Sequence, residues 1–562
     1  MPTLVERRYT LVDALLRPEA YPDEPTKVTL LETHVSYLFF VDDVVYKVKK
    51  PVDYGFLDFT NLGKRRFYCD REVALNSRMS PDVYMGVVPI RQDGNDIRVE
   101  GPGKTIEYAV KMHRLDADKA VSELLRRGLL TSGDVRAIAR KVARFHETAA
   151  TGTEVNDLGD LSSIRRNIEE NFEQTERFIG KTITSDEYED LVEYSRAFMR
   201  KNATMFRLRT RQGRIRDGHG DLHASNIFLG GEPEAMPKDG LGAVADAERE
   251  GLLRIEPVSI LPEKIHIIDC IEFNDRFRCA DVAEDIAFLA MDLDYFGRPD
   301  LSREFVEAYV EASGDTGVMA LMDFFKTYRA YVRGKVTSFR LDNPDLTNEE
   351  RLSVAGEAEA YFRLARSYAL LSVPRPALFI VGGLMGTGKS SIAEELANRW
   401  DLHYISSDLT RKRLADVAAT QHRYEEYGEG IYSAEYTRMT YEVMLDEARG
   451  RLASGEPVVV DATFRAVEER QRFSDAAASL RLETFVVECT AAEGEIKRRL
   501  EARITHAEET ISDGRWELYR RQQADWEPIT EVRANRLVQL DTTGPRSENL
   551  RKLVGEIFFR VM

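Results

Sequence analysis

Cysteine is scarce in this sequence, and long apolar runs are missing from it. Its 562 residues include four cysteines, with no C-x-x-C pair and no spacing typical of a metal site: Cys69, Cys270, Cys279 and Cys489. Such a pattern favours a reducing compartment and buried thiols. No apolar stretch approaches the length of a membrane span, and the first residues lack the apolar core of a signal peptide. These absences predict a cytoplasmic protein without a membrane-spanning segment.

An excess of basic charge is also missing, since the formal net charge is −17. This argues against a surface adapted as a whole to nucleic acid, although one basic cleft is compatible with an acidic average. At 562 residues the chain is too long for a single hydrophobic core, so we expect roughly two to four domains.

The most specific motif lies in residues 378–400. An apolar run leads into G-x-x-x-x-G-K-[ST], and helical spacing of apolar residues follows it. This is the setting of a P-loop, in which backbone N–H groups and a helix dipole surround phosphates, the lysine reaches the β- and γ-phosphates and the serine binds Mg²⁺. The predicted ATP-binding residues are Gly383, Gly386, Thr387, Gly388, Lys389, Ser390 and Ser391, with Ser390 also a metal ligand.

Near the N-terminus, three short β-type runs within residues 27–50 predict an antiparallel meander. Lys47 and Lys49 alternate with Val48 and therefore share one face of the third run. A charged helical stretch over residues 62–79 contains Glu72, and further strands follow. This order is that of a protein-kinase N-lobe, where a strand lysine pairs with a helix glutamate and holds ATP phosphates. We expect Lys47 to pair with Glu72, with Lys49 as the alternative lysine.

A second group of polar residues follows a helical region. Asp221 and Asn226 keep the D-x-x-x-x-N spacing of a kinase catalytic loop, and Asp269 directly follows another β-type run. One carboxylate would accept the proton of an attacking hydroxyl, while an amide oxygen and a second carboxylate hold Mg²⁺. Further along, Arg329, Arg333 and Lys335 are basic; contact with an anionic substrate is the alternative, but we expect a solvated helix face and leave them out of the site.

The motif from His219 to Asn226, together with Ile268 and Asp269, resembles the aminoglycoside phosphotransferase family of kinase-like enzymes. The resemblance covers residues ~25 to ~365. It implies that Asp221 is the catalytic base and that Asn226 and Asp269 bind Mg²⁺. The acceptor is not implied, because the family acts on many hydroxyl compounds. The sequence departs from the expected short hairpin by a loop-like insertion over residues 230–262.

The C-terminal part alternates strands and helices, which predicts a parallel sheet. Asp408 and Asp461 each follow a strand, and Arg499 and Arg503 share a helix face. These features are similar to those of P-loop kinases such as polynucleotide kinases and zeta-type toxins. The resemblance implies Asp408 as base or substrate-orienting carboxylate, Asp461 as the carboxylate on the Mg²⁺ side, and the two arginines as lid residues at ATP.

The sequence thus predicts a mixed α/β and α+β chain with two domains. A kinase-like domain would span residues 1–371, with an N-lobe at about 25–112 and a helical C-lobe at about 113–370. A linker at 372–376 and a P-loop domain at 377–562 would follow. We expect a bifunctional phosphotransferase that uses ATP and Mg²⁺ at two separate sites to phosphorylate hydroxyls of small molecules. In the alternatives, the P-loop part is an ATP-driven switch, or a kinase of nucleic-acid 5′-hydroxyls, which the acidic composition disfavours. Oligomeric state is not predicted.

Overall fold

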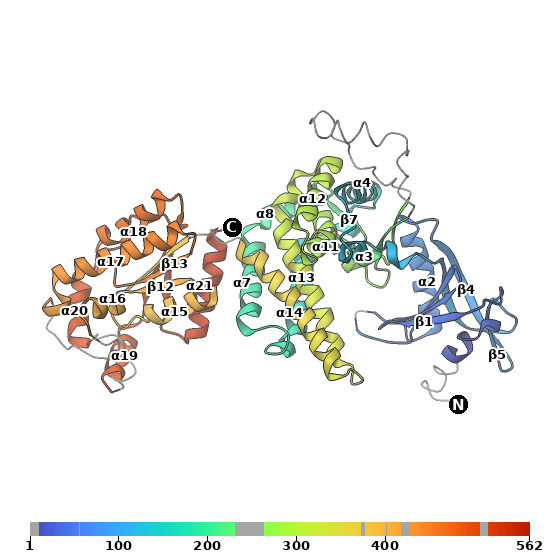
Figure 1. Cartoon of the computed structure of the whole chain (residues 1–562), viewed down its shortest axis with the longest axis horizontal. Coiled ribbons are helices and arrows are strands. Elements are labelled where there is room, and N and C mark those ends of the chain that lie inside the picture. Colours follow the sequence, from blue (N-terminus) through green and yellow to red (C-terminus); the bar gives the residue numbers. More distant parts are fainter. Residues whose placement is uncertain are drawn as a thin grey trace, which may run out of the picture. The chain divides into compact units, whose positions relative to one another are not determined.

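The computed structural model describes residues 11–55, 57–230, 264–371, 377–400, 402–417, 428–505 and 515–561. The chain divides into two compact units, one formed by Met1–Asn171 with Ala203–Arg333 and the other by Phe172–Asn202 with Gly334–Met562. Each unit combines a sheet with helices, so the predicted α/β fold class is confirmed (Figure 1). Within the described residues, no helix combines the length and the apolar character that crossing a membrane requires.

The first unit begins with a six-stranded antiparallel sheet, ordered β1-β2-β3-β6-β4-β5. Its strands are β1 (Val28–Glu32), β2 (Ser36–Val41), β3 (Val44–Lys49), β4 (Tyr84–Asp93), β5 (Asp96–Val99) and β6 (Lys104–His113). The pairing of β1 with β2 and of β2 with β3 confirms the predicted meander. Helix α2 (Leu62–Asn76) packs on β4 and β6, and Cys69 joins Val45, Val83 and Val110 in the core beneath it.

Helices form the rest of the first unit. They are α3 (Val121–Arg126), α4 (Ser132–Thr148), α5 (Thr153–Gly159), α6 (Leu161–Thr175), α8 (Ala203–Arg211), α10 (Asp275–Arg278), α11 (Val282–Tyr295), α12 (Pro299–Ser313) and α13 (Met322–Phe339), with 3₁₀ turns at Pro18–Ala20, Ala117–Lys119, Ala224–Asn226 and Thr316–Leu321. The last residues of α6 and of α13 belong to the second unit. Helix α11 is buried from Val282 to Leu293, and α4 and α12 pack against each other beside it. A helix that is buried on every side is surrounded by protein, so α11 is the centre of this lobe.

Two small antiparallel ladders lie between these helices. Strand β7 (Ile215–Asp217) pairs with β10 (Cys279–Asp281), and β8 (Ile227–Leu229) pairs with β9 (Ile265–Ile267). The second ladder ends where Leu229 faces Ile265, and Gly230 N donates to Lys264 O at 2.6 Å. The predicted insertion therefore connects the two strands of a hairpin. Apart from Gly230, it lies outside the described residues.

The second unit contains a five-stranded parallel sheet, ordered β12-β13-β11-β14-β15. The strands are β11 (Ala377–Gly382), β12 (His403–Ser406), β13 (Val458–Asp461), β14 (Glu483–Thr490) and β15 (Leu537–Asp541). The connecting helices are α15 (Lys389–Trp400), α16 (Ser407–Leu414), α17 (Ala434–Ala453), α18 (Val467–Ser479), α19 (Glu493–Thr505), α20 (Trp516–Ala524) and α21 (Arg546–Val561), with a 3₁₀ turn at Gly430–Tyr432. The predicted strand–helix alternation is confirmed. Every residue of β11 is buried, as expected of the central strand of a covered parallel sheet.

Helices from earlier in the chain also belong to the second unit. They are α7 (Ser185–Lys201) and α14 (Asn348–Leu371), with 3₁₀ turns at Glu176–Phe178 and Arg340–Asp342. Helix α7 packs against α21, where the ring centroids of Tyr194 and Phe558 are 5.5 Å apart. Asp190 of α7 is fully buried between Arg399 Nε at 2.5 Å and Arg366 Nε at 2.8 Å. The predicted linker at 372–376 lies outside the described residues.

Candidate active sites

Strand β3 and helix α2 bring two lysines and a glutamate together in the first unit. Lys47 Nζ lies 2.9 Å from Glu72 Oε1 and 2.5 Å from Asp269 Oδ1. Lys49 Nζ lies 2.6 Å from Glu72 Oε2 and also pairs with Glu272. The side chain of Lys47 is 13% exposed and that of Lys49 is 2% exposed. Lys47 thus borders the predicted metal ligand, whereas Lys49 belongs to the interior.

The charge of Glu72 depends on these lysines. Burial raises the pKa of its carboxyl group, but Lys47 and Lys49 outweigh burial and lower that pKa to about 2. Burial lowers the pKa of Lys47, but the carboxylates of Asp269, Glu72 and Glu272 outweigh burial and hold that pKa well above its usual value. Glu72 and Lys47 are therefore charged at neutral pH.

The loop after β7 carries Asp221, and a buried aspartate holds this loop in place. Asp285, in the first turn of α11, accepts hydrogen bonds from His219 N at 2.7 Å and from Gly220 N at 2.8 Å. Gly220 has φ +81°, and a Cβ there would lie 2.6 Å from Phe277 O, so the turn requires glycine. Asp285 was not among the predicted site residues. In the sequence it is visible only as an aspartate within an apolar helical run.

Backbone contacts join the two segments that hold the predicted metal ligands. Ile268 N donates to Asn226 O at 3.0 Å, and a ring nitrogen of His219 lies 3.0 Å from Ile268 O. Asn226 Nδ2 donates to Asp221 O at 3.0 Å. Asp269 has φ +63°, a left-handed conformation that is uncommon for any residue but glycine and that occurs at functional sites. The structure therefore brings Asp221, Asn226 and Asp269 together as the spacing predicts.

Asp221 is held in its ionised form. Burial raises the pKa of its carboxyl group, but His223, His219 and Arg333 outweigh burial and lower the pKa to about 2. His223 Nε2 lies 3.4 Å from Asp221 Oδ2. An ionised carboxylate at this position can accept a hydrogen bond from a hydroxyl and then its proton.

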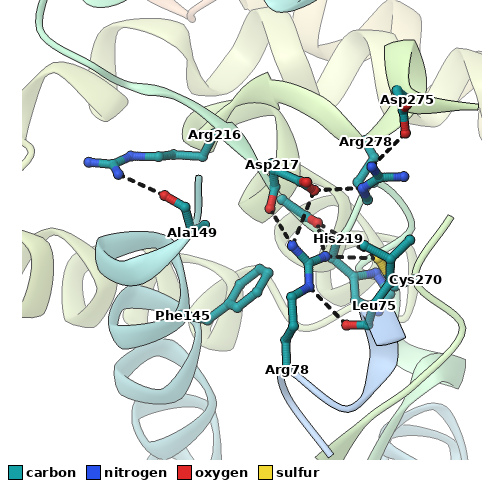
Figure 2. A network of polar contacts seen from close by, with 12 residues as sticks. Leu75, Arg78, Phe145, Ala149, Arg216, Asp217, His219, Cys270, Asp275 and Arg278 are labelled. Carbon is teal, nitrogen blue, oxygen red and sulfur yellow. Dashed lines mark hydrogen bonds and ion pairs between the residues drawn. The ribbon is translucent and has the colours of Figure 1, made fainter. Parts of the chain in front are cut away.

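Arg78, just after α2, connects three segments of this site (Figure 2). Its guanidinium donates to Asp217 O and Gly218 O, each at 2.9 Å, and lies 3.3 Å from Cys270 Sγ, while Nε donates to Leu75 O. Its cation lies 5.0 Å from the centre of the Phe145 ring. Arg78 thus ties the helix of Glu72 to the loop before Asp221 and to the residue after Asp269.

The second unit places its candidate residues at the carboxyl edge of the parallel sheet. Val381 is in register with Asp461 on β13, and Asp461 is in register with Ser406 on β12. Residues 383–388 connect β11 to α15, which begins at Lys389. Asp408 lies in the first turn of α16, directly after β12. The P-loop, Asp461 and Asp408 therefore meet at one edge, where open α/β sheets bind ligands.

Asp461 has the properties of a metal-side carboxylate. Its side chain is 2% exposed, and Tyr404 donates a hydrogen bond to Oδ2 at 3.0 Å. Burial raises the pKa of Asp461, while Lys389 and a hydrogen bond from Ser390 lower it less strongly. In the part of the chain that the structure describes, its buried Oδ1 has no hydrogen-bond partner of acceptable geometry. An acceptor oxygen in this position, next to the serine of a P-loop, fits a Mg²⁺ ion.

A cavity of about 420 Å³ adjoins the P-loop. Gly388, Arg499, Thr542, Gly544, Arg546 and Asn549 are among its lining residues. Arg499 Nη2 donates to Thr542 O at 2.6 Å, and Thr542 Oγ1 donates to Thr387 O at 2.5 Å. The cavity is continuous with the loop that would hold phosphates, and its size suits a nucleoside. Arg503 lies in α19, but its side chain is outside what the structure describes.

The predicted solvated face of α13 is wrong for one residue. Arg329 is 4% exposed, and its Nη2 lies 3.2 Å from Glu284 Oε1. Arg333 and Lys335 are half-buried. The prediction failed because α13 packs inside the helical lobe, and the periodicity of one helix does not reveal how many neighbours surround it.

Two mycobacterial proteins match nearly the whole chain. The uncharacterized protein Rv2004c of Mycobacterium tuberculosis (strain ATCC 25618 / H37Rv) is 30% identical over 535 residues, which cover 95% of this chain and 96% of that protein. The uncharacterized protein Mb2027c of Mycobacterium bovis matches with the same values. The chain belongs to their family. The match extends through both units of this chain.

Residues 378–527 match a family model, AAA_33, described as an AAA domain, and the C-terminal part is accordingly a P-loop domain. Solved structures resemble the chain more distantly. A choline/ethanolamine kinase family protein from Mesorhizobium loti covers 64% of this chain and 99% of its own, with 11% identity and a TM-score of 0.34. A gluconokinase from Sinorhizobium meliloti 1021 covers 33% of this chain and 93% of its own, with 22% identity and a TM-score of 0.24.

Proposed function

We propose that the protein is a bifunctional phosphotransferase in which each half transfers the γ-phosphoryl group of ATP to a hydroxyl of a small molecule. The N-terminal half would act as an aminoglycoside phosphotransferase-like kinase and the C-terminal half as a P-loop kinase. The observation that carries the proposal is the convergence, in the first unit, of Lys47, Glu72 and Asp269 with the loop of Asp221 and Asn226. Such a set suits phosphoryl transfer, which depends on positioning and charge neutralisation.

In the N-terminal half, the residues divide into two groups by chemistry. Lys47, fixed by Glu72, offers an ammonium group to phosphate oxygens beside Asp269. Asp221 orients the acceptor hydroxyl and takes its proton as the new P–O bond forms and the bond to the ADP leaving group breaks. Asn226 and Asp269 would hold Mg²⁺, which supplies neutralising charge on the phosphates when bound. The described residues contain no cluster of three His, Cys, Asp or Glu side chains that could hold a metal, so the phosphates would complete its coordination.

In the C-terminal half, the P-loop, Lys389 and Arg499 surround the phosphates, and Ser390 with Asp461 would hold Mg²⁺. Asp408 is the candidate base, because it follows β12 at the edge where Asp461 ends β13. Its charge also acts on the pKa of Asp461, raising it, which supports their proximity. A switch that only hydrolyses ATP requires no base for an acceptor hydroxyl. The presence of Asp408 therefore favours a kinase over a switch.

The test measures ATP turnover with and without a metabolite extract, since the acceptors are not assigned. The N-terminal site is examined in a Lys389→Ala protein and the C-terminal site in an Asp221→Ala protein. Within these backgrounds we expect Asp221→Asn or Asp408→Asn to lower extract-stimulated turnover by about 10² or more, because a general base contributes that much. Binding of Mg²⁺ with an ATP analogue should change by no more than a few-fold.

Two results would contradict the proposal. Fast basal hydrolysis that responds neither to extract nor to Asp408→Asn would identify the P-loop half as a switch. A loss of nucleotide affinity in Asp221→Asn as large as the loss of turnover would make Asp221 a metal ligand instead of a base. As a matched control, Asp82→Asn changes an exposed carboxylate of the first unit and should leave both measurements unchanged.

A further inference from the structure

The side-chain amide of Gln522, on helix α20, lies between the P-loop and the loop that follows Asp461. Its Oε1 accepts a hydrogen bond from Met385 N at 2.8 Å. Its Nε2 donates to Thr463 Oγ1 at 3.4 Å. The two loops are also joined directly, because Gly383 N donates to Thr463 O at 3.2 Å. One side chain of α20 therefore contacts both of the segments that the proposed function places around the phosphates.

These contacts fix the direction in which the amide points. The backbone N–H of Met385 can only donate, so the atom that it meets is the amide oxygen of Gln522. The amide nitrogen then lies on the side of Thr463 and carries two hydrogens, of which the threonine hydroxyl takes one. Within the described part of the chain, Nε2 has no second acceptor. One N–H donor of Gln522 is therefore available to a ligand.

The place of Gln522 along the P-loop indicates which phosphate it faces. Gly388 and Ser391 are among the residues that line the cavity suited to a nucleoside, at the α15 end of the loop. Met385 lies earlier in the loop, toward β11. Mg²⁺ bridges the β- and γ-phosphates in such sites, so the γ-phosphate lies on the side of Asp461 and of the loop after it. The phosphate that faces Gln522 is accordingly the one farthest from the nucleoside.

Helix α20 is packed against the P-loop around this contact. Tyr519 is 5% exposed and belongs to an apolar cluster with residues of α19, and Leu384 and Met385 of the P-loop pack against this cluster. Gln522 follows Tyr519 by one helical turn and therefore lies on the same face of α20. A packed helix thus carries the amide to the loop.

We propose that Gln522 is a γ-phosphate-binding residue of the C-terminal site, whose Nε2 donates a hydrogen bond to an oxygen of the γ-phosphoryl group while its Oε1 stays on Met385 N. The inference rests on the proposed function of this site. A hydrogen bond to an ionised phosphate oxygen is stronger than one between neutral groups. ADP lacks the γ-phosphoryl group, so this contact distinguishes ATP from ADP at the end of the nucleotide that reacts.

The first test compares the affinities for ADP and for a non-hydrolysable ATP analogue, measured by calorimetry with Mg²⁺. The protein is the full chain with Lys47→Ala, which leaves the C-terminal site to bind nucleotide. Gln522→Glu is the main variant, because its carboxylate still accepts from Met385 N but cannot donate and repels phosphate. We expect the analogue to bind about tenfold or more weakly, while ADP binds within a few-fold of the parent.

Two further variants separate the possible causes of a loss. Gln523→Glu introduces the same charge at the next, exposed residue of α20 and should bind both nucleotides as the parent does. Gln522→Met removes donor and acceptor without adding charge and should also weaken the analogue more than ADP. An equal loss for the two nucleotides in both Gln522 variants would make Gln522 a structural brace of the P-loop and overturn the inference. A selective loss in Gln522→Glu alone would attribute the effect to charge and overturn it as well.

The second test follows extract-stimulated ATP turnover in the Asp221→Ala background. Gln522→Glu should lower this turnover about tenfold or more, and Gln523→Glu should leave it unchanged. Unchanged turnover in Gln522→Glu, together with unchanged affinities, overturns the inference and leaves the proposed kinase function standing. A selective loss of analogue affinity in both Gln522 variants, without transfer of phosphate to any acceptor, counts against the kinase function alone. No binding of either nucleotide by the parent contradicts both.

Discussion

Lys47 and Lys49 lie on one face of β3 but have different roles in this site, because their side chains are buried to different extents. Lys49 is enclosed by Glu72, Glu272 and the Phe59 ring, whose centre is 5.0 Å from its Nζ. Lys47 is more exposed and reaches Asp269. The first is therefore expected to stabilise the fold, and the second to contact phosphate.

This difference predicts opposite results for two alanine variants. Lys49→Ala removes the cation paired with buried Glu272 and one of the two cations paired with Glu72, and it should lower the free energy of unfolding by about 3–5 kcal/mol. Lys47→Ala should cost less stability but abolish binding of an ATP analogue at this site. Thermal melts and calorimetry in a Lys389→Ala background measure both. Retained nucleotide binding in Lys47→Ala would show that the assignment of the two lysines is reversed.

Glu284 gives a pH-dependent prediction. In the unfolded chain its carboxyl group titrates near 4.5, but burial raises its pKa to about 7 in the folded state. Between these values the folded protein binds a proton that the unfolded chain has lost, so stability falls as pH rises. Glu284→Gln removes this term. Its stability relative to the natural protein should rise by up to about 3 kcal/mol from pH 5 to pH 8, at about 1.4 kcal/mol per pKa unit. Urea melts at the two pH values test this, with exposed Glu311→Gln as a control that should show no such trend.

For single residues, the sequence predicts contacts between side chains that are close together in the chain. Asp221 and Asn226 are close in the chain, and their motif placed them correctly together. Asp285 and Arg78 act on the same loop from far along the chain, and no local pattern reports such contacts. Strand alternation shows that Lys47 and Lys49 lie on the same face of β3, but it does not show how deeply each side chain is buried. The choice between the two lysines therefore stayed open.

Among the elements, helix α2 and the loop after β7 act together through Arg78. The arginine holds the carbonyl oxygens of Asp217 and Gly218 and thereby fixes where the loop starts. The sequence predicted both elements, since alternating and helical periodicities reveal strands and helices. It did not predict their connection, because that depends on how the helix is oriented on the sheet.

We therefore expect Arg78→Met to lower kcat of the N-terminal site while the KM for ATP changes little. Arg78 contacts Leu75, Phe145, Asp217, Gly218 and Cys270, none of which is assigned to phosphate, metal or acceptor. Its loss should therefore loosen the Asp221 loop without removing a ligand contact. Hydrogen exchange of the amides at residues 218–221 should increase in parallel. Arg66→Met changes an exposed arginine on α2 and is the matched control. An equal loss of kcat there, or a large rise in the KM for ATP with Arg78→Met, would contradict a positioning role.

For the molecule as a whole, the main prediction is that two nucleotides bind independently. Each half carries its own phosphate-binding groups and candidate metal ligands, so calorimetry should count two equivalents of an ATP analogue. Lys389→Ala should bind one equivalent, and so should Lys47→Ala, while the double variant should bind none. A value of zero or two for Lys389→Ala would refute the separation. The sequence predicted two modules from their motifs. It did not predict that α7 packs in the second unit, because no sequence motif indicates this contact.

The membership of α7 in the second unit has a consequence for how the chain is made. Helix α7 leaves the ribosome long before α21, which covers Tyr194 with Phe558 at the end of the chain. At about 5–20 residues per second, the interval from Lys201 to Arg546 lasts tens of seconds. Asp190 lacks its partners until Arg366 and Arg399 have been made, and Tyr194 lacks the Phe558 ring throughout this interval. Synthesis of the last helix, and not of any earlier one, therefore completes a core that was begun in the first half of the polypeptide.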